Sequence, residues 1–221
     1  MAGETGETQG FTVAALLARH GVTFCEELGI DIAAGTPEAL FRWLVASLLM
    51  SARISSATAV KAARALADAG WTTPQAMAGS TWEERVKVLN RSGYARYDES
   101  TARMLGEDAA MLLDRYQGDL RQLREKAGRD PATERALLKR FKGIGEVGAD
   151  IFCREAQAAW DELYPFADRK ALASAARLGL PDTAEGLAGL CGRADFPRLA
   201  AALVRCALAK DHEGVLRAAG T

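Results

Sequence analysis

The stretch 131-PATERALLKRFKGIGEVGADIFCREAQAAW-160 decides how the chain folds. Its three glycines after Phe141 have the spacing of a GxGxxG dinucleotide-binding fingerprint, and Asp168 follows at about the distance where that fingerprint places a carboxylate. A dinucleotide site needs a strand before the glycines and a helix after them, within a βαβ unit. Residues 131–141 instead carry apolar side chains at helical spacing, so the stretch predicts a helix, a tight turn and a second helix.

This helix–hairpin–helix arrangement gives the turn a chemical role. Gly143 and Gly145 permit backbone angles that are closed to other residues, and they let a ligand approach without a Cβ in the way. Ile144 is expected to tuck inward between the helices. The N–H groups of the turn and of the following helix start form an anion site, which on a duplex would hold a phosphate. The alternative, that 142–148 is only a tight interhelical turn, stays open at this point.

The rest of the chain has the same helical periodicity, with almost no alternating β-branched runs, and therefore predicts an all-α protein. The helices are expected at residues 10–20, 37–50, 56–69, 74–78, 81–90, 97–116, 119–127, 131–141, 146–160, 168–178, 182–191 and 195–210. The first ten residues and the last seven are expected to be frayed tails.

The composition describes a folded protein but does not identify its partner. The 221 residues are 49% apolar, which is enough to fill a core, and the formal net charge is −1. Any nucleic-acid surface must therefore come from local clusters of Lys and Arg. The polar start 1–10 has no signal-peptide pattern, and the apolar run 44–50 is too short to span a bilayer. We expect a cytoplasmic protein with no membrane contact.

The four cysteines, Cys25, Cys153, Cys191 and Cys206, are scattered without a CxxC pair. This spacing argues against a structural zinc site, an iron–sulfur cluster and a disulfide framework. We expect the cysteines to be mostly buried apolar side chains, and we expect the protein to require no cofactor.

Several segments together resemble the endonuclease III-like DNA glycosylases, the helix–hairpin–helix (HhH-GPD) superfamily. The stretch 38-EALFRWLVASLLMSARISSATAVKAARAL-66 resembles the opening helices of that family. The segment 92-SGYARYDESTARML-105 is similar to its glycine-aromatic turn, and the hairpin and 166-FADRKALASAARLGL-180 follow in the family's order and spacing. The resemblance covers roughly residues 36–182 and is to a member without an iron–sulfur cluster, since the family's four-cysteine cluster near the C-terminus is missing here.

The resemblance implies two helical lobes with DNA bound in the cleft between them. One lobe would be a run of about six helices over residues 36–160, including the helix–hairpin–helix at about 131–160. The second would combine residues 1–35 with residues 161–221, so that the first and last parts of the chain pack on each other. The implied partner is double-stranded DNA containing a damaged or abasic site, bound by a monomer.

The resemblance also assigns roles to the hairpin backbone. The N–H groups that would hold a phosphate beside the lesion belong to Gly143, Gly145 and Val147, and the Lys142 side chain at the tip would contact a phosphate or be solvated. The carbonyls that would bind a monovalent cation, K⁺ or Na⁺, belong to Lys139, Phe141 and Ile144.

Asp168 falls where the family places its catalytic aspartate, immediately before a helix. By its residue type alone it is a helix N-cap, and the two roles are compatible. In the catalytic role its carboxylate would stabilise the positive charge that develops on the deoxyribose, or orient an attacking water. The target base must first be flipped out of the stack into a pocket.

Val147 occupies the position at which family members that also cut the DNA backbone carry a lysine nucleophile. An aliphatic side chain cannot form a Schiff base, so the abasic-site lyase step is doubtful. Lys142 and Lys170 are conceivable substitutes, but a helical residue two positions after Asp168 is expected to point to a different side.

Arg53 stands where the family often has a glutamine that fills the gap left by the flipped base. An arginine can fill that space and hydrogen-bond to the orphaned base, or it can be an exposed loop residue. The aromatic residues that could stack on a base, although aromatics at helical spacing more often lie in a core, are Tyr94, Tyr97, Trp43 and Trp160.

Three functions follow from these patterns. The first is a monofunctional DNA glycosylase that uses Asp168 and water to remove a damaged or mismatched base. The second is a bifunctional glycosylase and abasic-site lyase that uses another lysine. The third is a DNA-binding protein that has this scaffold without the chemistry. The identity of the base is not specified by the sequence.

Overall fold

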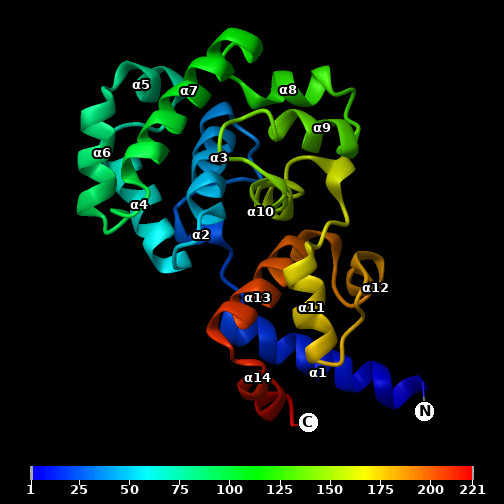
Figure 1. The fold of residues 1–221 in the computed structure, drawn as a ribbon. Helices are drawn as coiled ribbons and strands as arrows, with labels where there is room; N and C mark the ends of the chain where they lie inside the picture. Colours follow the sequence, from blue (N-terminus) through cyan, green and yellow to red (C-terminus); the bar gives the residue numbers. More distant parts are fainter. Residues whose placement is uncertain (1, 221) are drawn as a thin grey trace.

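The computed structural model describes the backbone of residues 2–220 and the side chains of residues 6–220 (Figure 1). The predicted all-α class is confirmed, because 70% of the chain is helical and the described residues contain no strand. The α-helices are α1 (Ala2–His20), α2 (Phe24–Glu27), α3 (Pro37–Ser51), α4 (Ser56–Asp68), α5 (Pro74–Gly79), α6 (Trp82–Arg91), α7 (Asp98–Tyr116), α8 (Leu120–Lys126), α9 (Pro131–Leu138), α10 (Glu146–Ala156), α11 (Arg169–Arg177), α12 (Ala184–Ala188), α13 (Phe196–Ala209) and α14 (His212–Ala219). Two short 3-10 helices are η1 (Asp161–Leu163) and η2 (Arg193–Asp195).

Local capping chemistry sets where several helices begin. The Thr36 hydroxyl accepts a hydrogen bond from the N–H of Ala39 at 3.2 Å, and Pro37 occupies the first turn of α3, where its missing N–H is not needed. Asp130 caps α9 in the same way, through the N–H of Thr133 at 2.8 Å. Helices α3 and α9 therefore begin at the residues that the sequence predicts.

Helix α3 forms the core of the upper part of the molecule in Figure 1. It packs on α4 and on α10, while α7 covers α5 and α6. The fully buried Trp43 of α3 donates its indole N–H to the backbone carbonyl of Phe152 on α10 at 3.0 Å. This contact and the surrounding apolar packing hold the second hairpin helix against the core.

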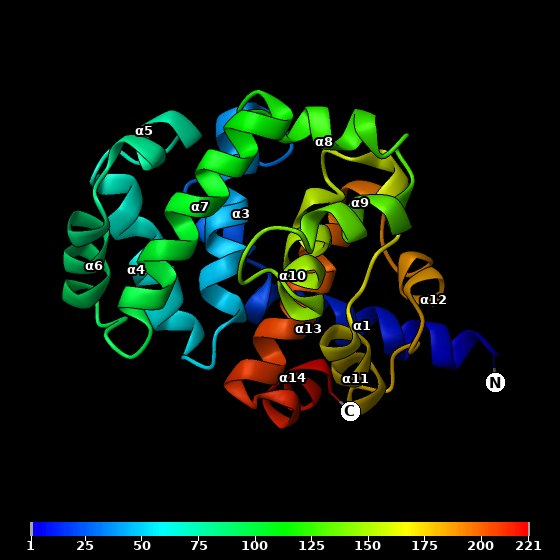
Figure 2. The same ribbon diagram turned by 45° about the horizontal axis from the view of Figure 1, so that its top comes forward.

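The two ends of the chain lie together in the lower part of Figure 1. Helix α1 packs on α13 and α14, and α11 packs on α13. Arg19 of α1 forms an ion pair with Asp211, just before α14, at 2.7 Å. Helix α13 also packs on α10, so this group of helices meets the hairpin (Figure 2). The division into lobes of residues 36–160 and 1–35 plus 161–221 stays a prediction.

Both chain ends differ from the expected frayed tails. Helix α1 begins at Ala2, and the last seven residues lie largely within α14; only residues 1 and 221 lie outside the described residues. The reason is tertiary packing, because Leu16 of α1 and Val215 of α14 are completely buried. Short helices that are marginal in isolation become stable when they bury an apolar face.

Helix boundaries near the hairpin also differ from the expectation. Helix α9 ends at Leu138 rather than at residue 141, and α10 ends at Ala156 rather than at residue 160. The turn between them is therefore longer than the glycine pattern alone indicates. The single-turn helix α2 was not predicted, because its four residues are too few to show a period.

Candidate functional site

The turn between α9 and α10 has two glycines with different structural roles. Gly143 has a φ of +77°, and a Cβ at this position would lie 2.9 Å from the Met104 sulfur. Gly145 is the N-cap of α10 with a φ of −93°, it offers no side-chain cap, and a Cβ there would meet no atom within 4 Å. Gly143 therefore shapes the turn, and Gly145 leaves the N–H groups at the start of α10 open to an anion.

A buried carboxylate from another helix anchors the hairpin tip. Asp108 on α7 is 5% exposed, and its Oδ1 accepts the backbone N–H of Lys142 at 2.6 Å. Burial raises the pKa of Asp108 to about 7, although the hydrogen bond from Lys142 opposes that rise. The Ser51 hydroxyl of α3 donates to the Gly143 carbonyl at 3.2 Å. The sequence did not predict the role of Asp108. An aspartate in a mostly polar part of a helix gives no sign that it binds a backbone N–H 34 residues further along the chain.

Ion pairs join the two hairpin helices. Arg135 of α9 contacts Asp150 at 2.5 Å and Glu146 at 3.0 Å, and Lys139 also pairs with Glu146. The Phe141 carbonyl accepts the N–H of Ile144 at 3.1 Å, which folds the turn back on itself. Ile144 is buried between the helices, as expected.

The predicted cation set is of the right chemical type. The carbonyl oxygens of Lys139, Phe141 and Ile144 are hard ligands of the kind that K⁺ and Na⁺ prefer, and the hydrogen bond at Phe141 leaves that oxygen a further lone pair. No group of three His, Cys, Asp or Glu side chains within the described part of the chain could hold a metal ion.

A pocket of about 340 Å³ lies beside the hairpin, within the size range of small-molecule sites. Its walls come from the end of α3 and the following turn, one face of α10, the start of α11 and the end of α13. Much of the lining is apolar, including Ile54, Val147, Ile151, Val204 and Leu208. Val147 is 59% exposed and Leu208 is 42% exposed, so hydrophobic side chains also reach the open part of the pocket.

The pocket contains Asp168, which caps α11. Its Oδ1 accepts the backbone N–H groups of Lys170 at 2.8 Å and Ala171 at 3.0 Å, so the predicted N-cap is confirmed. Its Oδ2 accepts a hydrogen bond from Nη1 of Arg154 at 2.5 Å. Asp168 and Arg154 are 7% and 3% exposed, so this is a buried ion pair at the wall of the pocket.

Arg154 is the residue that sequence reasoning missed most clearly. It lies on α10 one further turn along the face that carries Val147 and Ile151, and all three line the pocket. The spacing could have indicated this from the sequence, because Arg154 is seven residues after Val147 and residues seven apart lie on the same face of a helix. The partner, Asp168, follows only after the helix has ended and the chain has turned.

The other predicted residues have different surroundings. Lys170 is exposed and lines the same pocket as Asp168, at the first turn of α11, and the expectation that its side chain points to a different side stays a prediction. Lys142 is exposed at the hairpin tip. Arg53 is exposed in the turn between α3 and α4, between the pocket residues Ala52 and Ile54. The DNA contacts assigned to these side chains stay predictions.

The aromatic candidates belong mainly to the core. Trp43, Trp160 and Tyr94 are fully buried and do not line the pocket, and the Tyr94 hydroxyl donates to the Leu49 carbonyl at 3.1 Å. Tyr97 is half-buried beside Tyr94, with ring centroids 6.5 Å apart. The cysteine prediction is confirmed for Cys25, Cys153 and Cys206, which are buried, while Cys191 is partly exposed.

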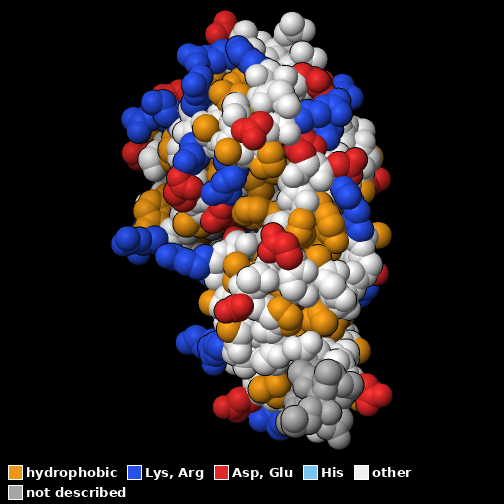
Figure 3. Space-filling view, turned by 90° about the vertical axis from the view of Figure 1, so that its right-hand side faces the viewer, with side chains coloured by type: hydrophobic (Ala, Val, Ile, Leu, Met, Phe, Trp, Pro, Cys, Tyr) orange, Lys and Arg blue, Asp and Glu red, His pale blue; other side chains and the backbone are white. Residues whose placement is uncertain are grey.

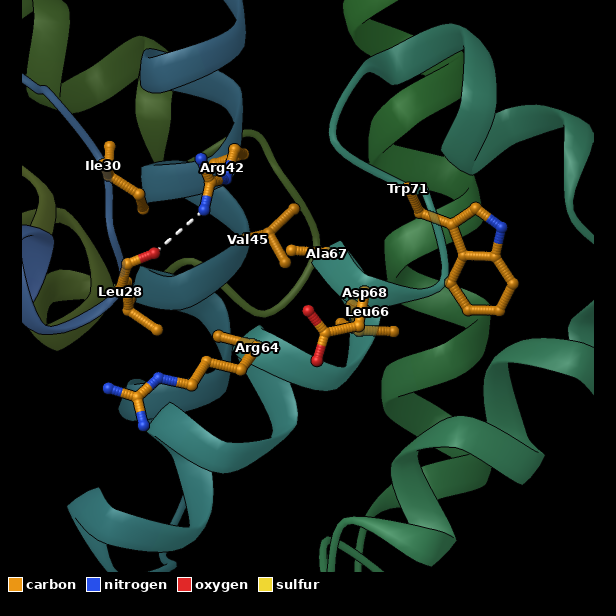
Figure 4. A pocket seen from close by; sticks show the side chains of 10 residues that line it. Leu28, Ile30, Arg42, Val45, Arg64, Leu66, Ala67, Asp68 and Trp71 are labelled. Carbon is orange, nitrogen blue, oxygen red and sulfur yellow. Dashed lines mark hydrogen bonds between the residues drawn. The ribbon is translucent and has the colours of Figure 1, made fainter.

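A second hollow shares no lining residue with the Asp168 pocket. It is bounded by Leu28, Val45, Arg64 and Trp71, and its volume of about 70 Å³ is below the range of ligand sites (Figure 4). Arg42 points across it and donates to the Leu28 carbonyl at 2.9 Å. Arg64, which also lines it, donates to the Glu27 carbonyl, so both guanidinium groups are engaged within the protein.

The charge distribution is uneven despite the near-neutral total. On the face shown in Figure 3, Lys and Arg side chains lie mainly over the upper, wider part of the molecule, where Asp and Glu side chains are interspersed with them, and hydrophobic side chains are exposed across its middle. Local clusters of this kind are what a protein of net charge −1 needs in order to meet a polyanion. None of the described helices is long and apolar enough to cross a membrane.

No protein-family model and no curated protein matches this sequence. Among solved structures, the chain is similar to one described as a non-covalent endonuclease III–DNA complex, with a TM-score of 0.55 and 20% identity over 88% of this chain and 81% of that one. A trapped covalent endonuclease III–DNA intermediate with an estranged adenine matches at a TM-score of 0.47 and 19% identity, over 74% and 71% of the two chains. The first of these likenesses shows that the protein has the all-helical fold of endonuclease III.

Proposed function

We propose that this protein is a DNA repair glycosylase that flips a damaged or mismatched base out of duplex DNA and hydrolyses its glycosidic bond. The observation that carries the proposal is that the hairpin and Asp168 meet at one pocket. Val147, at the start of the second hairpin helix, and Asp168, at the start of α11, both line it. Phosphate binding and base removal require those two elements to be adjacent.

The hairpin would bind the DNA backbone, and one copy of the protein would bind the duplex. The N–H groups of Gly143, Gly145 and Val147 would hold a phosphate at the α10 N-terminus, where the helix dipole also favours an anion. The carbonyls of Lys139 and Phe141, together with that of Ile144, would hold a monovalent cation that draws the phosphate in. Lys142 would add a charge at the hairpin tip, and Arg53 would enter the gap in the stack.

Asp168 would act on the sugar once the base is in the pocket. The carboxylate would stabilise positive charge on the deoxyribose as the glycosidic bond breaks, and a water molecule would then complete the hydrolysis. The apolar lining would exclude bulk water and strengthen that interaction. The backbone N–H groups of α11 hold Oδ1, so the carboxylate is oriented before the substrate arrives.

The test compares Asp168→Asn with the wild-type protein on duplexes that carry alkylated, oxidised, deaminated and mismatched bases. Asparagine is an equally good N-cap, but it leaves the Arg154 guanidinium buried and unpaired, so the melting temperature of the variant is measured first and excision is compared below it. Excision should fall by about 10²–10³-fold, the usual cost of removing one electrostatic contact to a transition state. Asp182→Asn, at an exposed position outside the pocket, is the matched control and should have wild-type activity. Unchanged excision by Asp168→Asn would contradict the assignment.

We further propose that the enzyme is monofunctional. Val147 has no nucleophile, although Lys170 is among the residues that line the same pocket. Borohydride reduction on abasic-site DNA traps a Schiff base as a covalent adduct. We expect no adduct with the wild-type protein; an adduct that disappears in Lys170→Met would instead establish a lyase with a displaced lysine.

The Arg154–Asp168 ion pair favours one alternative, a DNA-binding protein without catalysis. The guanidinium already neutralises the carboxylate at 2.5 Å, which weakens its effect on a developing positive charge. In that case every duplex in the panel would stay intact under alkali, while binding to abasic-site DNA would persist.

A further inference from the structure

Arg154 has hydrogen-bonding capacity that the protein itself does not use. Its side chain is 4% exposed, and its one side-chain hydrogen bond to a described residue is that from Nη1 to Asp168. The Nε group is buried without a hydrogen-bond partner in the described chain. A guanidinium offers several N–H donors in a fixed plane, so a buried arginine with an unpartnered N–H is unusual. Nε is enclosed by the protein, but Nη2 also makes no hydrogen bond to a described residue and is not fully buried. Because Arg154 lines the pocket, Nη2 is the donor available to a molecule that enters.

The pocket around Arg154 has an excess of positive charge. Its lining includes three basic side chains, Arg154, Arg169 and Lys170, and two acidic ones, Asp150 and Asp168. The Asp150 carboxylate is compensated from outside the lining by Arg135 at 2.5 Å. Arg169 and Lys170 are exposed and make no ion pair with a described residue.

We propose that Arg154 selects the base by its charge. The pocket would accept a neutral base that offers a carbonyl oxygen to the guanidinium, and it would reject N-alkylated purines that carry a positive charge. The inference rests on the proposed function, and it names the substrate class of the same pocket. Asp168 compensates the Arg154 charge, so the repulsion depends on a cationic base lying nearer to the guanidinium than to the carboxylate. Arg169 and Lys170, which line the same pocket without an acidic partner among the described residues, add to it.

The same arrangement suits the departure of a neutral base. When the C1′–N bond breaks, its electron pair stays on the base nitrogen, so the base becomes an anion and the sugar becomes a cation. The water oxygen then bonds to C1′, and the proton that it releases ends on the base nitrogen. Arg154 lies where it can stabilise the anionic base, while its ion-pair partner Asp168 stabilises the cationic sugar. A cationic base leaves as a neutral molecule and gains nothing from the guanidinium.

A purely positioning role for Arg154 makes a different prediction. If the guanidinium only held Asp168 in place, its loss would affect neutral and cationic bases equally. Selection by charge instead predicts that the loss removes the difference between them. The two roles are therefore separated by a comparison between bases of the same shape.

The test uses two duplexes that contain 7-methylguanine, which is cationic, or 7-deaza-7-methylguanine, which is its neutral isostere. Both carry a 2′-fluoroarabino sugar, because fluorine at C2′ opposes positive charge on the sugar and blocks hydrolysis. Binding is measured at a mildly acidic pH that keeps the first base cationic. The wild-type protein should bind the neutral isostere at least about tenfold more tightly, or about 1.4 kcal/mol.

Three variants make the outcome decisive. Arg154→Gln should lose the preference for the neutral isostere, and Arg154→Lys, which keeps the charge, should keep that preference. Arg154→Gln leaves the Asp168 charge buried and alone, which attracts a cationic base and destabilises the fold. The double variant Arg154→Gln/Asp168→Asn removes both charges of the ion pair and leaves neither of them unpaired. It too should show no preference.

Two results would overturn the proposal: a wild-type protein that binds the cationic base as tightly as its isostere, or a charge preference that survives in the glutamine variants. The measurement needs no excision. A protein that shows the preference but leaves every lesion duplex intact would therefore refute the proposed glycosylase function and leave the role of Arg154 in binding established.

Discussion

Replacing each hairpin glycine with alanine separates folding from DNA binding. Gly145→Ala introduces a Cβ that meets no protein atom within 4 Å, at a φ of −93° that alanine adopts freely. The free energy of unfolding should change by less than about 1 kcal/mol, because the loss of a glycine N-cap and the smaller conformational entropy of alanine in the unfolded chain oppose each other. The new methyl group would nevertheless occupy the open space in front of the α10 N-terminus.

The expected effect of Gly145→Ala is therefore on affinity. A charge-assisted hydrogen bond to a phosphate contributes about 1.5–3 kcal/mol, and a Cβ at this position would lengthen or break at least one. That loss corresponds to roughly a tenfold to hundredfold weaker affinity for a duplex with a stable abasic-site analogue. Fluorescence anisotropy with a labelled duplex measures it directly.

Gly143→Ala is the matched comparison and should mainly destabilise the fold. A φ of +77° costs an L-residue about 1–2 kcal/mol, and the Cβ would approach the Met104 sulfur to 2.9 Å and Leu48 Cγ to 3.4 Å. For a chain of this size the melting temperature should fall by roughly 2–8 °C. Wild-type affinity in Gly145→Ala, or equal destabilisation by the two changes, would refute the reasoning.

Three further predictions concern single residues. Asp108 has a folded pKa of about 7 against an ordinary value of 3.8, so the folded state keeps a proton that the unfolded chain loses, and stability falls as the pH rises through that window. Above pH 7 the free energy of unfolding of Asp108→Asn should therefore exceed that of the wild type by at least about 1 kcal/mol, which thermal melting measures as a higher melting temperature. This advantage should disappear below the ordinary pKa of an aspartate. A difference that stays constant across pH would contradict the burial of a proton at Asp108. Val147→Lys places an amine on the exposed first turn of α10 and should produce a borohydride-trapped adduct on abasic-site DNA, and its absence would show that position 147 does not face the sugar. Arg53→Ala should weaken binding to abasic-site DNA by about tenfold with stability unchanged to about 0.5 kcal/mol, whereas equal affinity would make Arg53 a solvated loop residue.

The local features of this protein could be predicted from the sequence because they depend on neighbouring residues. Thr36 and Pro37 start a helix wherever they precede an apolar periodic run, and Asp168 caps α11 because its carboxylate reaches the next N–H groups. The glycines of the hairpin likewise specify a turn, since Gly143 is needed at its positive φ. The helical class and the hairpin therefore followed from short-range patterns.

The site itself was decided by tertiary contacts. Arg154 and Asp168 are separated by the end of α10 and the chain that follows it, and the Asp108 carboxylate reaches Lys142 from a different helix. The termini became helices for the same reason, because α1 packs against both α13 and α14. Backbone propensity acts over a few residues, whereas burial and ion pairing depend on which surfaces meet. The sequence by itself therefore determined most of the internal helices, the hairpin and the N-cap position of Asp168. Only the packing of distant helices decided that the termini are helical and that Asp168 shares its pocket with a buried arginine.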